Sequence, residues 1–261
     1  MRVSLVITTY NRPDALLLVL RSIEGQVILP DEVIIANDGG DSESQKLITD
    51  FRESSSLNII HSWQENKGFR AAKSRNKAIS KSNFDYIVLI DGDMILHPKF
   101  ISDHINQAQL GFFVQGSRVL LTQDKTMQTI DQQKINFSLL SNGLKNRKNA
   151  IHSNILSKLF SNKRNYLRGV RTCNMAFFKQ DCIKINGFNN DFEGWGREDT
   201  EFIMRLLNSG INRKNVRFNA IQFHLWHIEN IRDSLEKNNA ILQETINNHN
   251  QWCNNGIDNY L

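Results

Sequence analysis

The first hundred residues alternate between two hydrophobic periodicities, and this alternation leaves few folds open. Short apolar runs rich in Val and Ile are typical of buried strands, and amphipathic segments with a helical period separate them. The expected strands are 3–9, 32–36, 57–61 and 86–90, and the expected helices are 13–23, 42–51 and 71–79. Such an order implies right-handed βαβ crossovers. The sequence therefore predicts an α/β protein with a parallel sheet and helices on both faces.

Polar loops follow the expected strands. The carboxyl ends of parallel strands meet at one edge of a sheet, where open α/β folds bind ligands. The loops are Thr9-Tyr10-Asn11-Arg12, Asn37-Asp38-Gly39-Gly40, Asn66-Lys67-Gly68-Phe69-Arg70 and Asp91-Gly92-Asp93. None has the G-x-G-x-x-G or G-x-x-x-x-G-K-[ST] spacing, so a dinucleotide fold and a P-loop are disfavoured. Their carboxylates, basic side chains and small residues favour a nucleotide-sugar pocket.

Asp91-Gly92-Asp93 ends the continuous apolar run 86–90, which is typical of a buried parallel strand. Two carboxylates separated by one small residue are hard oxygen ligands that suit Mg²⁺ or Mn²⁺, and the metal can in turn hold a diphosphate. An Asp-x-Asp pair is a weak signal by itself. Its place at the end of a buried strand strengthens it.

A second carboxylate pair, Glu198 and Asp199, follows the glycine-flanked Trp195 and precedes an amphipathic pattern that reaches Leu207. The pair therefore belongs to the first turn of a helix. One interpretation is that both carboxylates only complement the helix dipole. The other is that one of them is a catalytic base, because a flat aromatic face beside a carboxylate suits a sugar ring with its hydroxyl donors. The tryptophan favours the second interpretation.

The composition limits the classes of protein to which this chain can belong. With 261 residues, 40% of them hydrophobic and 23% charged, the chain can bury a full core as one large domain. No apolar run approaches the roughly 20 residues of a membrane span, and the N-terminus has the pattern of a strand and not of a signal peptide. We therefore expect a cytoplasmic protein. Cys173, Cys182 and Cys253 show no C-x-x-C spacing, which indicates reduced thiols.

The net charge of +5 is modest and scattered, so no nucleic-acid partner is expected. Basic residues concentrate at 145–148 and again at 158–168, where apolar residues are interleaved. Such segments form either a solvated loop or helix face, or a peripheral contact with anionic lipid or a lipid-linked acceptor, here at the inner face of the plasma membrane.

The rest of the chain has a looser pattern. Residues 122–166 are rich in Gln, Asn, Lys and Ser and predict a partly helical insertion or lid. After it the sequence predicts a strand at 173–178, a short helix at 181–185, the helix through Leu207, a strand at 220–225 and a polar helix at 233–248.

His224 and His227 lie at the end of the expected strand 220–225. Two histidines three residues apart can be incidental. A metal held only by Asp91 and Asp93 would nevertheless lack a further protein ligand, and either imidazole can complete its shell. Imidazole is softer than carboxylate, which favours Mn²⁺ over Mg²⁺.

These motifs resemble those of known enzymes. Residues 3–12, Asn37-Asp38-Gly39 and Asp91-Gly92-Asp93 resemble the family 2 inverting glycosyltransferases of the GT-A fold. Residues 169–202, with Asn186-Gly187-Phe188 and Gly194-Trp195-Gly196-Arg197-Glu198-Asp199, are similar to the C-terminal half of β-1,4-galactosyltransferases and of bacterial chondroitin-polymerase-like enzymes. The resemblance implies a Rossmann-like central sheet, mixed but mostly parallel and flanked by helices. It divides one continuous domain into a donor-binding half (1–121), the insertion near the acceptor side (122–166), and an acceptor-binding and catalytic half (167–261).

The resemblance also implies a role for each matching residue. The residues expected to bind the UDP-sugar are Thr8, Thr9, Tyr10, Arg12, Asp38, Phe69, Arg70, Lys73, Asp91 and Gly92. The expected ligands of Mn²⁺ or Mg²⁺ are Asp93, His227 and His224. The expected acceptor-binding residues are Trp195, Gly196, Arg197 and Glu198, and the catalytic pair is Glu198 with Asp199 as the base.

Two positions depart from the pattern of the galactosyltransferases. His224 stands where those enzymes have the Met of a Met-x-x-His pair, and Arg197 stands where they have a second glycine. The departure at His224 makes His227 the better-supported ligand. The one at Arg197 means that acceptor choice cannot be copied from those enzymes.

The implied reaction moves a hexose or N-acetylhexosamine from a UDP-sugar to a hydroxyl of a saccharide or lipid-linked saccharide, with inversion. Bacterial capsule, lipopolysaccharide or another surface glycan is the expected product. The alternative is a non-catalytic nucleotide-sugar or carbohydrate-binding protein of the same fold. A two-metal nucleotidyltransferase is disfavoured, since the first hundred residues supply no third clustered carboxylate with a basic triphosphate loop.

Overall fold

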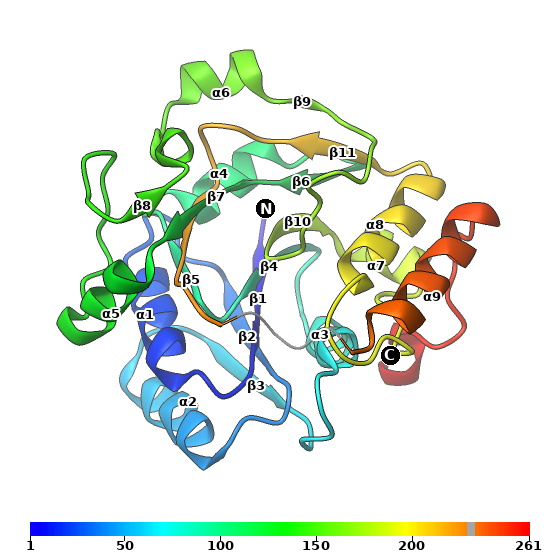
Figure 1. Cartoon of the computed structure of the whole chain (residues 1–261), viewed down its shortest axis with the longest axis horizontal. Helices are drawn as coiled ribbons and strands as arrows, with labels where there is room; N and C mark the ends of the chain where they lie inside the picture. The colour runs from blue at the N-terminus through cyan, green and yellow to red at the C-terminus, as the bar shows by residue number, and fades with distance from the viewer. Residues whose placement is uncertain (229–232) are drawn as a thin grey trace.

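The computed structural model describes residues 1–228 and 233–261, and a mixed sheet forms its centre (Figure 1). Within these residues the strand order is β3-β2-β1-β4-β10-β6-β11-β9. The strands are β1 (Val3–Thr9), β2 (Glu32–Asn37), β3 (Ile59–Trp63), β4 (Tyr86–Asp91), β6 (Phe112–Gln115), β9 (Asn162–Lys163), β10 (Asn174–Phe178) and β11 (Asn212–Asn215). Strands β3, β2, β1 and β4 are parallel, and β10 runs antiparallel to β4 and β6. The predicted mixed, mostly parallel sheet is confirmed.

Helices cover both faces of the sheet, because successive side chains of each strand point to opposite faces. Leu5 and Ile7 of β1 pack with α1 (Pro13–Glu24) and α2 (Ser42–Ser54), whereas Val6 packs with α3 (Ala71–Ser80) and α8 (Glu198–Asn208). The helices are α1 (Pro13–Glu24), α2 (Ser42–Ser54), α3 (Ala71–Ser80), α4 (Phe100–Gln107), α7 (Lys179–Lys184), α8 (Glu198–Asn208) and α9 (Leu235–Asn247), and a 3-10 turn, η2 (Ile257–Tyr260), lies at the C-terminus. Apart from α4 and η2, each corresponds to a helix expected from the sequence.

A second, smaller sheet was not predicted. Its strands are β5 (Met94–Leu96), β7 (Ser117–Leu121), β8 (Leu144–Lys145) and β12 (Ile221–His224), in the order β5-β12-β7-β8. β12 pairs antiparallel with β5, with His224 opposite Met94, and the Leu225 amide donates to the Asp93 carbonyl at 3.0 Å. This pairing carries the end of β12 to the end of the Asp91-Gly92-Asp93 loop.

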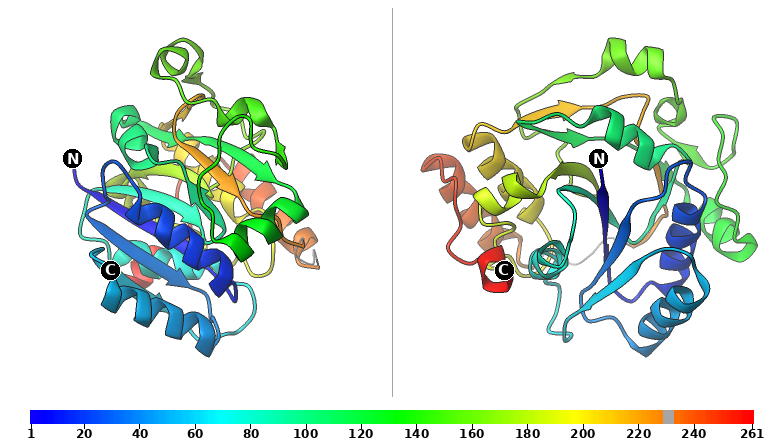
Figure 2. Two further views of the ribbon diagram at one scale, coloured as in Figure 1. Left: turned by 90° about the vertical axis from the view of Figure 1, so that its left-hand side faces the viewer. Right: turned by 180° about the vertical axis from the view of Figure 1, so that it is seen from behind.

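The segment 122–166 is partly helical, as expected. It contains α5 (Gln123–Gln132), η1 (Arg147–Ala150) and α6 (Asn154–Phe160), besides β8 and β9. Ile130 and Phe137 pack against the apolar side of the small sheet. Helix α6 stands out from the body of the protein in every view (Figure 2).

Other expectations are refined. The strand expected at 57–61 lies at Ile59–Trp63. Residues 94–121, for which the sequence predicted no helix or strand, fold into β5, α4, β6 and β7. The three cysteines are buried free thiols. In the part of the chain that the structure describes, no helix combines the length and hydrophobicity that crossing a bilayer requires.

Candidate active site

A cleft of about 1350 Å³ opens at the carboxyl edge of the parallel strands. It gathers residues from the four predicted loops, from the tryptophan motif and from the end of β12. Of the residues expected in the site, those that line it are Thr8, Thr9, Tyr10, Arg12, Asp38, Phe69, Asp91, Gly92, Asp93, Trp195, Gly196, Arg197, Glu198, Asp199, His224 and His227. Arg70 and Lys73 instead line a neighbouring cavity of about 500 Å³. The fold thus brings the two carboxylate motifs to one cleft.

Asp38 is buried at the end of β2, where protein groups already engage both of its oxygens. Oδ1 accepts from Gln64 Nε2 and Oδ2 from the Arg70 amide, each at 2.6 Å. Burial raises the pKa of Asp38, against the opposing effect of these hydrogen bonds. Asp38 therefore fixes the loop that contains Arg70 and shapes this wall of the cleft.

Gly92 permits a close approach between two loops. Its amide donates to the Thr8 carbonyl at 2.7 Å, and a Cβ at this position would lie 2.8 Å from Thr9 Oγ1. Any side chain there would separate the loops after β1 and β4. The glycine is thus required for the shape of the cleft floor.

Asp93, His224 and His227 converge on one point. Asp93 Oδ2 lies 3.3 Å from His224 Nε2 and 3.5 Å from His227 Nε2. Burial would raise the pKa of Asp93, but the hydrogen bond from His224 and the charges of both histidines outweigh it and hold the pKa below the usual value. The carboxyl is therefore ionised at neutral pH.

These three side chains fit a divalent cation. Among the described residues, Asp93 Oδ1 is buried without a hydrogen-bond partner. His227 Nδ1 lies 2.8 Å from the Ile228 carbonyl, which favours the tautomer with a free lone pair on Nε2. One carboxylate and two imidazoles, all with ligand atoms within 4.8 Å of one another, suit Mn²⁺. Asp91 faces Arg75 and is not part of this cluster.

Arg75 connects the two carboxylate motifs, and sequence analysis did not select it. Its guanidinium, 5% exposed, donates to Thr8 Oγ1 at 3.1 Å, to Asp91 Oδ1 at 3.3 Å and to Asp199 Oδ1 at 2.9 Å. Glu198 Oε1 lies 3.6 Å away. Burial alone would lower the pKa of Arg75, but the three carboxylates outweigh it and raise the pKa. The arginine is a permanent buried cation.

A signal for Arg75 does exist in the sequence. Helix α3 buries Ala71, Ala72, Ala78 and Ile79, and Arg75 falls on the same face at i+4 from Ala71 and i−3 from Ala78. A charged residue on the buried face of a helix needs a partner, because arginine is almost never fully buried unpaired. The pattern indicates burial but cannot name the partners.

Asp199 and Glu198 begin α8 as predicted, and their environments differ. Asp199 accepts from Arg75, from the Thr172 amide at 3.0 Å and from Thr172 Oγ1 at 2.5 Å, and its side chain is 26% exposed. Burial, and next the charge of Asp199, raises the pKa of Glu198 to about 7. Three hydrogen bonds thus fix the orientation of the Asp199 carboxyl group, while Glu198 exchanges a proton near neutral pH.

The loop before α8 takes left-handed backbone conformations. Gly194, Gly196 and Arg197 have φ of 71°, 108° and 78°. A Cβ on Gly194 would lie 2.2 Å from Ser234 Oγ, so the loop packs tightly under the start of α9. Trp195, 37% exposed, lies in the cleft wall. The left-handed φ of Arg197 explains why a glycine suits this position.

Comparison with known proteins assigns the family. The model of glycosyl transferase family 2 matches residues 4–184, more than half of the chain. The chain belongs to glycosyl transferase family 2. A second model, described as the N-terminal domain of galactosyltransferase, matches residues 154–228, which include Trp195, Glu198 and Asp199. The prediction of a glycosyltransferase is thereby confirmed at the level of the family.

The family 2 chain is similar to parts of larger curated proteins. It is 27% identical to the chondroitin synthase of Escherichia coli over 85% of this chain and 34% of that protein. It is 26% identical to the hyaluronan synthase of Pasteurella multocida over 79% of this chain and 23% of that protein. The chain thus spans about a third or less of these relatives.

Solved structures support the fold. S. aureus TarS matches 95% of this chain and 40% of its own length with a TM-score of 0.60 at 15% identity. TarS 1–349 in complex with UDP matches 95% of this chain and 66% of its own with a TM-score of 0.58. The GT-A fold expected from the sequence is confirmed.

Proposed function

We propose that the protein transfers a hexose or N-acetylhexosamine from a UDP-sugar to a hydroxyl of a saccharide, free or lipid-linked, with inversion at the anomeric carbon. The observation that carries the proposal is the meeting, in one cleft, of three side chains that could hold a cation (Asp93, His224, His227) and an oriented carboxyl group (Asp199). A binding protein needs no base beside a metal. The family assignment and the structure of the neighbour TarS 1–349 in complex with UDP support a UDP-sugar donor.

The proposed donor site is built by residues 1–121 together with the two histidines at the end of β12. Tyr10, Arg12 and the Asp91-Gly92-Asp93 loop line the cleft on this side, and the neighbouring cavity adds Arg70 and Lys73. Asp93, His224 and His227 would hold Mn²⁺, which neutralises charge on the diphosphate leaving group when bound. The basic side chains contribute to the same neutralisation.

The proposed acceptor site lies on the side of α8. Trp195 offers an apolar face to a sugar ring, and Glu198, with its pKa of about 7, can donate or accept a hydrogen bond with an acceptor hydroxyl. Thr126, Met127 and Lys145 of the segment 122–166 also line the cleft, consistent with a lid on this side. The relatives named as chondroitin, hyaluronan and poly-β-1,6-N-acetyl-D-glucosamine synthases favour a polysaccharide acceptor.

In the proposed step, the acceptor oxygen forms a bond to the anomeric carbon while the bond from that carbon to the UDP oxygen breaks. The hydroxyl proton passes to Asp199. A carboxylate offers about four lone-pair positions, and the three hydrogen bonds from Arg75 and Thr172 leave one for this proton. The same three bonds fix the orientation of the base, and general-base catalysis of this kind contributes about 10²–10⁴-fold.

The test is Asp199→Asn, assayed by UDP release from a panel of UDP-sugars with Mn²⁺ and saccharide acceptors. We expect transfer to fall by roughly 10²-fold or more while UDP affinity stays near wild type, because the donor site is built by other residues. The control is Asp181→Asn, the same change in α7 outside the cleft, which should keep full activity.

The outcomes separate the parts of the proposal. Near-normal transfer by Asp199→Asn rejects Asp199 as the base. A wild-type protein that binds UDP-sugars but transfers no sugar to any acceptor supports the non-catalytic alternative.

A further inference from the structure

Helix α6 has its amphipathic pattern turned outward. A helix on the surface of a globular protein normally directs its apolar residues toward the core. Within α6, all of which the structure describes, the buried residue is Ser157, whereas Ile155 and Leu159 are 74% and 71% exposed and Phe160 is 49% exposed. Ile155 and Leu159 are four residues apart and therefore share one face. This apolar face is therefore directed to the outside and not to the protein interior.

Polar contacts attach the helix to the body. The Ser153 amide donates to the Phe218 carbonyl at 2.9 Å, and Ser161 Oγ accepts from the Arg217 amide at 3.1 Å. Phe160 packs against Phe218 with ring centroids 5.7 Å apart and ring planes inclined by 60°. The backbone is thus held in place while the aliphatic side chains stay outside.

The chain around α6 concentrates positive charge. Residues 132–180 contain ten Lys and Arg and no Asp or Glu, which leaves 22 basic against 27 acidic residues in the rest of the chain. The segment is therefore strongly basic although the remainder is net acidic. Lys158 lies within α6, Lys163 follows it, and Arg217 lies beside its C-terminal end; all three are exposed.

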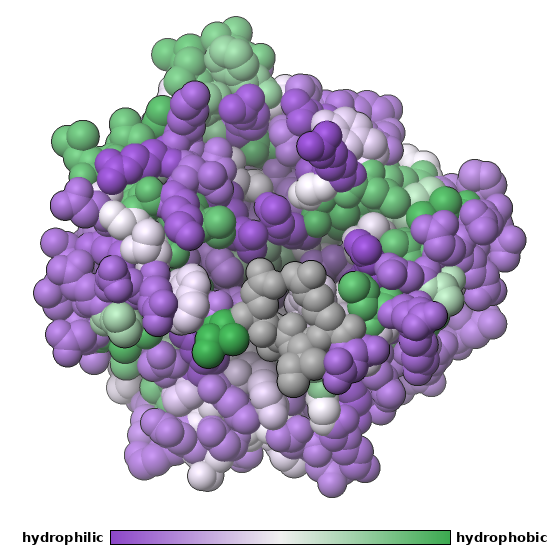
Figure 3. Space-filling model, in the orientation of Figure 1, coloured by the Kyte–Doolittle hydropathy of each residue, from purple (hydrophilic) through white to green (hydrophobic). Residues whose placement is uncertain are grey.

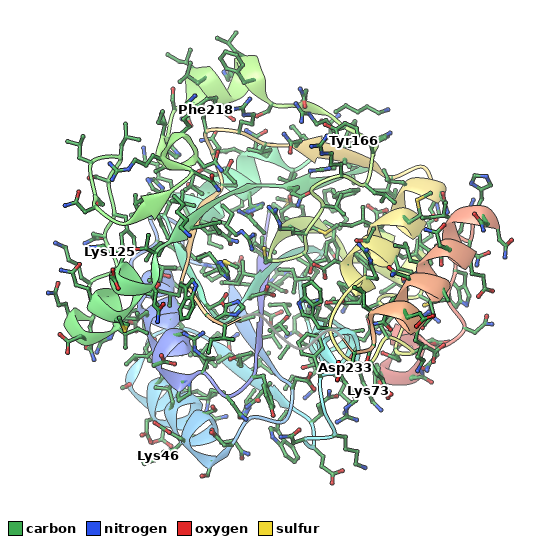
Figure 4. All side chains as sticks on the ribbon, in the orientation of Figure 1. Lys46, Lys73, Lys125, Tyr166, Phe218 and Asp233 are labelled. Carbon is green, nitrogen blue, oxygen red and sulfur yellow. The ribbon has the colours of Figure 1, made fainter. Side chains whose placement is uncertain are left out.

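The apolar residues lie on a protrusion. Figure 3 shows hydrophobic side chains gathered at the top of the molecule, where Figure 1 places α6, with hydrophilic residues below them. Phe218 and Tyr166 lie on the same side (Figure 4). We call Ile155, Leu159, Phe160, Lys158, Lys163 and Arg217 the α6 surface.

We propose that the α6 surface docks the protein on an anionic lipid bilayer. Aliphatic side chains on a convex tip can enter the headgroup region, and the surrounding basic residues match lipid phosphates. A second copy of this chain would present the same positive charge and be repelled. A nucleic acid would favour a basic groove with stacking aromatics over a projecting aliphatic tip.

The surface is continuous in sequence with the wall of the cleft. Lys145, within the basic segment 132–180, lines the cleft. A bilayer contact through α6 would therefore hold that wall close to lipid-linked material. Docking on a bilayer would complement the proposed sugar transfer, but the docking proposal does not depend on that activity.

The experiment measures binding to vesicles of phosphatidylcholine alone and of phosphatidylcholine with 30% phosphatidylglycerol, by sedimentation without donor or acceptor. We expect wild-type protein to bind the anionic vesicles at least about 10-fold more tightly, and to lose this preference in 0.5 M salt, where the Debye length is below about 5 Å. Ile155→Ser/Leu159→Ser should weaken binding at least about 10-fold through lost apolar burial. Lys158→Gln/Lys163→Gln should weaken it roughly 30-fold, about 5-fold per charge.

The matched control is Val27→Ser/Leu29→Ser, which removes two exposed aliphatic side chains from the connection between α1 and β2. It should bind like wild type. UDP release with a soluble acceptor should be unchanged in Ile155→Ser/Leu159→Ser, which shows that the variant is folded. The proposal is overturned if wild type does not distinguish the two vesicles or if the control and the α6 variant bind equally. A dimer that Ile155→Ser/Leu159→Ser converts to monomer would overturn it in favour of a second copy.

Discussion

Replacing Arg75 with methionine tests the network that joins the two halves of the cleft. The substitution keeps much of the side-chain volume and removes the cation. Removing one partner of a buried ion pair costs about 3–5 kcal/mol. The three carboxylates are 11% to 35% exposed, so water screens part of their repulsion, and we expect a loss of about 2–3 kcal/mol at pH 8. For a chain of this size this corresponds to a fall in Tm of about 5–10 °C.

The loss should depend on pH. With Arg75 present the pKa of Asp91 is already raised to about 6, by burial first and then by neighbouring charges, and that of Glu198 to about 7. Without the arginine both rise further. A carboxyl whose pKa is raised in the folded state stabilises the fold below its unfolded pKa, and this stabilisation is lost as pH rises through the folded pKa. The gap between Arg75→Met and wild type should therefore be larger at pH 8 than at pH 5.

The assay is calorimetric unfolding at pH 5 and pH 8. The control is Lys77→Met, the replacement of another cation on α3, for which we expect a change within about 0.5 kcal/mol. A loss in Arg75→Met no greater than that of the control, or one equal at both pH values, would refute the role of Arg75 as the counter-ion of these carboxylates.

Three further predictions concern the metal site and Glu198. Asp93→Ala should reduce Mn²⁺-dependent UDP binding by at least roughly 10-fold in calorimetry, because loss of even a side chain that only hydrogen-bonds to a metal ligand weakens metal binding by about this factor. Unchanged affinity would exclude Asp93 as a ligand. His227→Ala should weaken Mn²⁺ binding more than His224→Ala does, and titration curves like wild type for both variants would make both histidines structural. Glu198→Gln should gain stability relative to wild type as pH rises from 4.5 to 7, by up to about 3 kcal/mol. The reason is that wild type must ionise the Glu198 carboxyl group, whose pKa is raised by burial and by the charge of Asp199. A difference in unfolding free energy that stays constant across this pH range would contradict the raised pKa.

Much of the fold could be predicted because its signals are local. The alternating periodicities located β1, α1, β2, α2, α3 and β4 within a few residues, and parallel pairing then required their loops to share one edge. The same reasoning set Asp91-Gly92-Asp93 at the end of β4 and the Glu198-Asp199 pair at the start of α8. Short strands such as β5, β8 and β9 escaped prediction because two or three residues carry no readable period.

The sequence by itself determined that the loops after β1, β2 and β4 and the start of α8 meet at the cleft, and the tertiary structure decided how their side chains combine. Arg75 meets Asp199 across 124 residues of chain, and β12 brings His224 to Asp93 by pairing with β5. The exposure of the apolar face of α6 likewise depends on what the rest of the chain leaves uncovered. Hydrophobic periodicity indicates only which face of a helix or strand will be buried and which loops will lie at the edge of the sheet. Which charge neutralises which carboxylate depends on packing between segments distant in sequence, and that is settled when the sheet and its helices assemble.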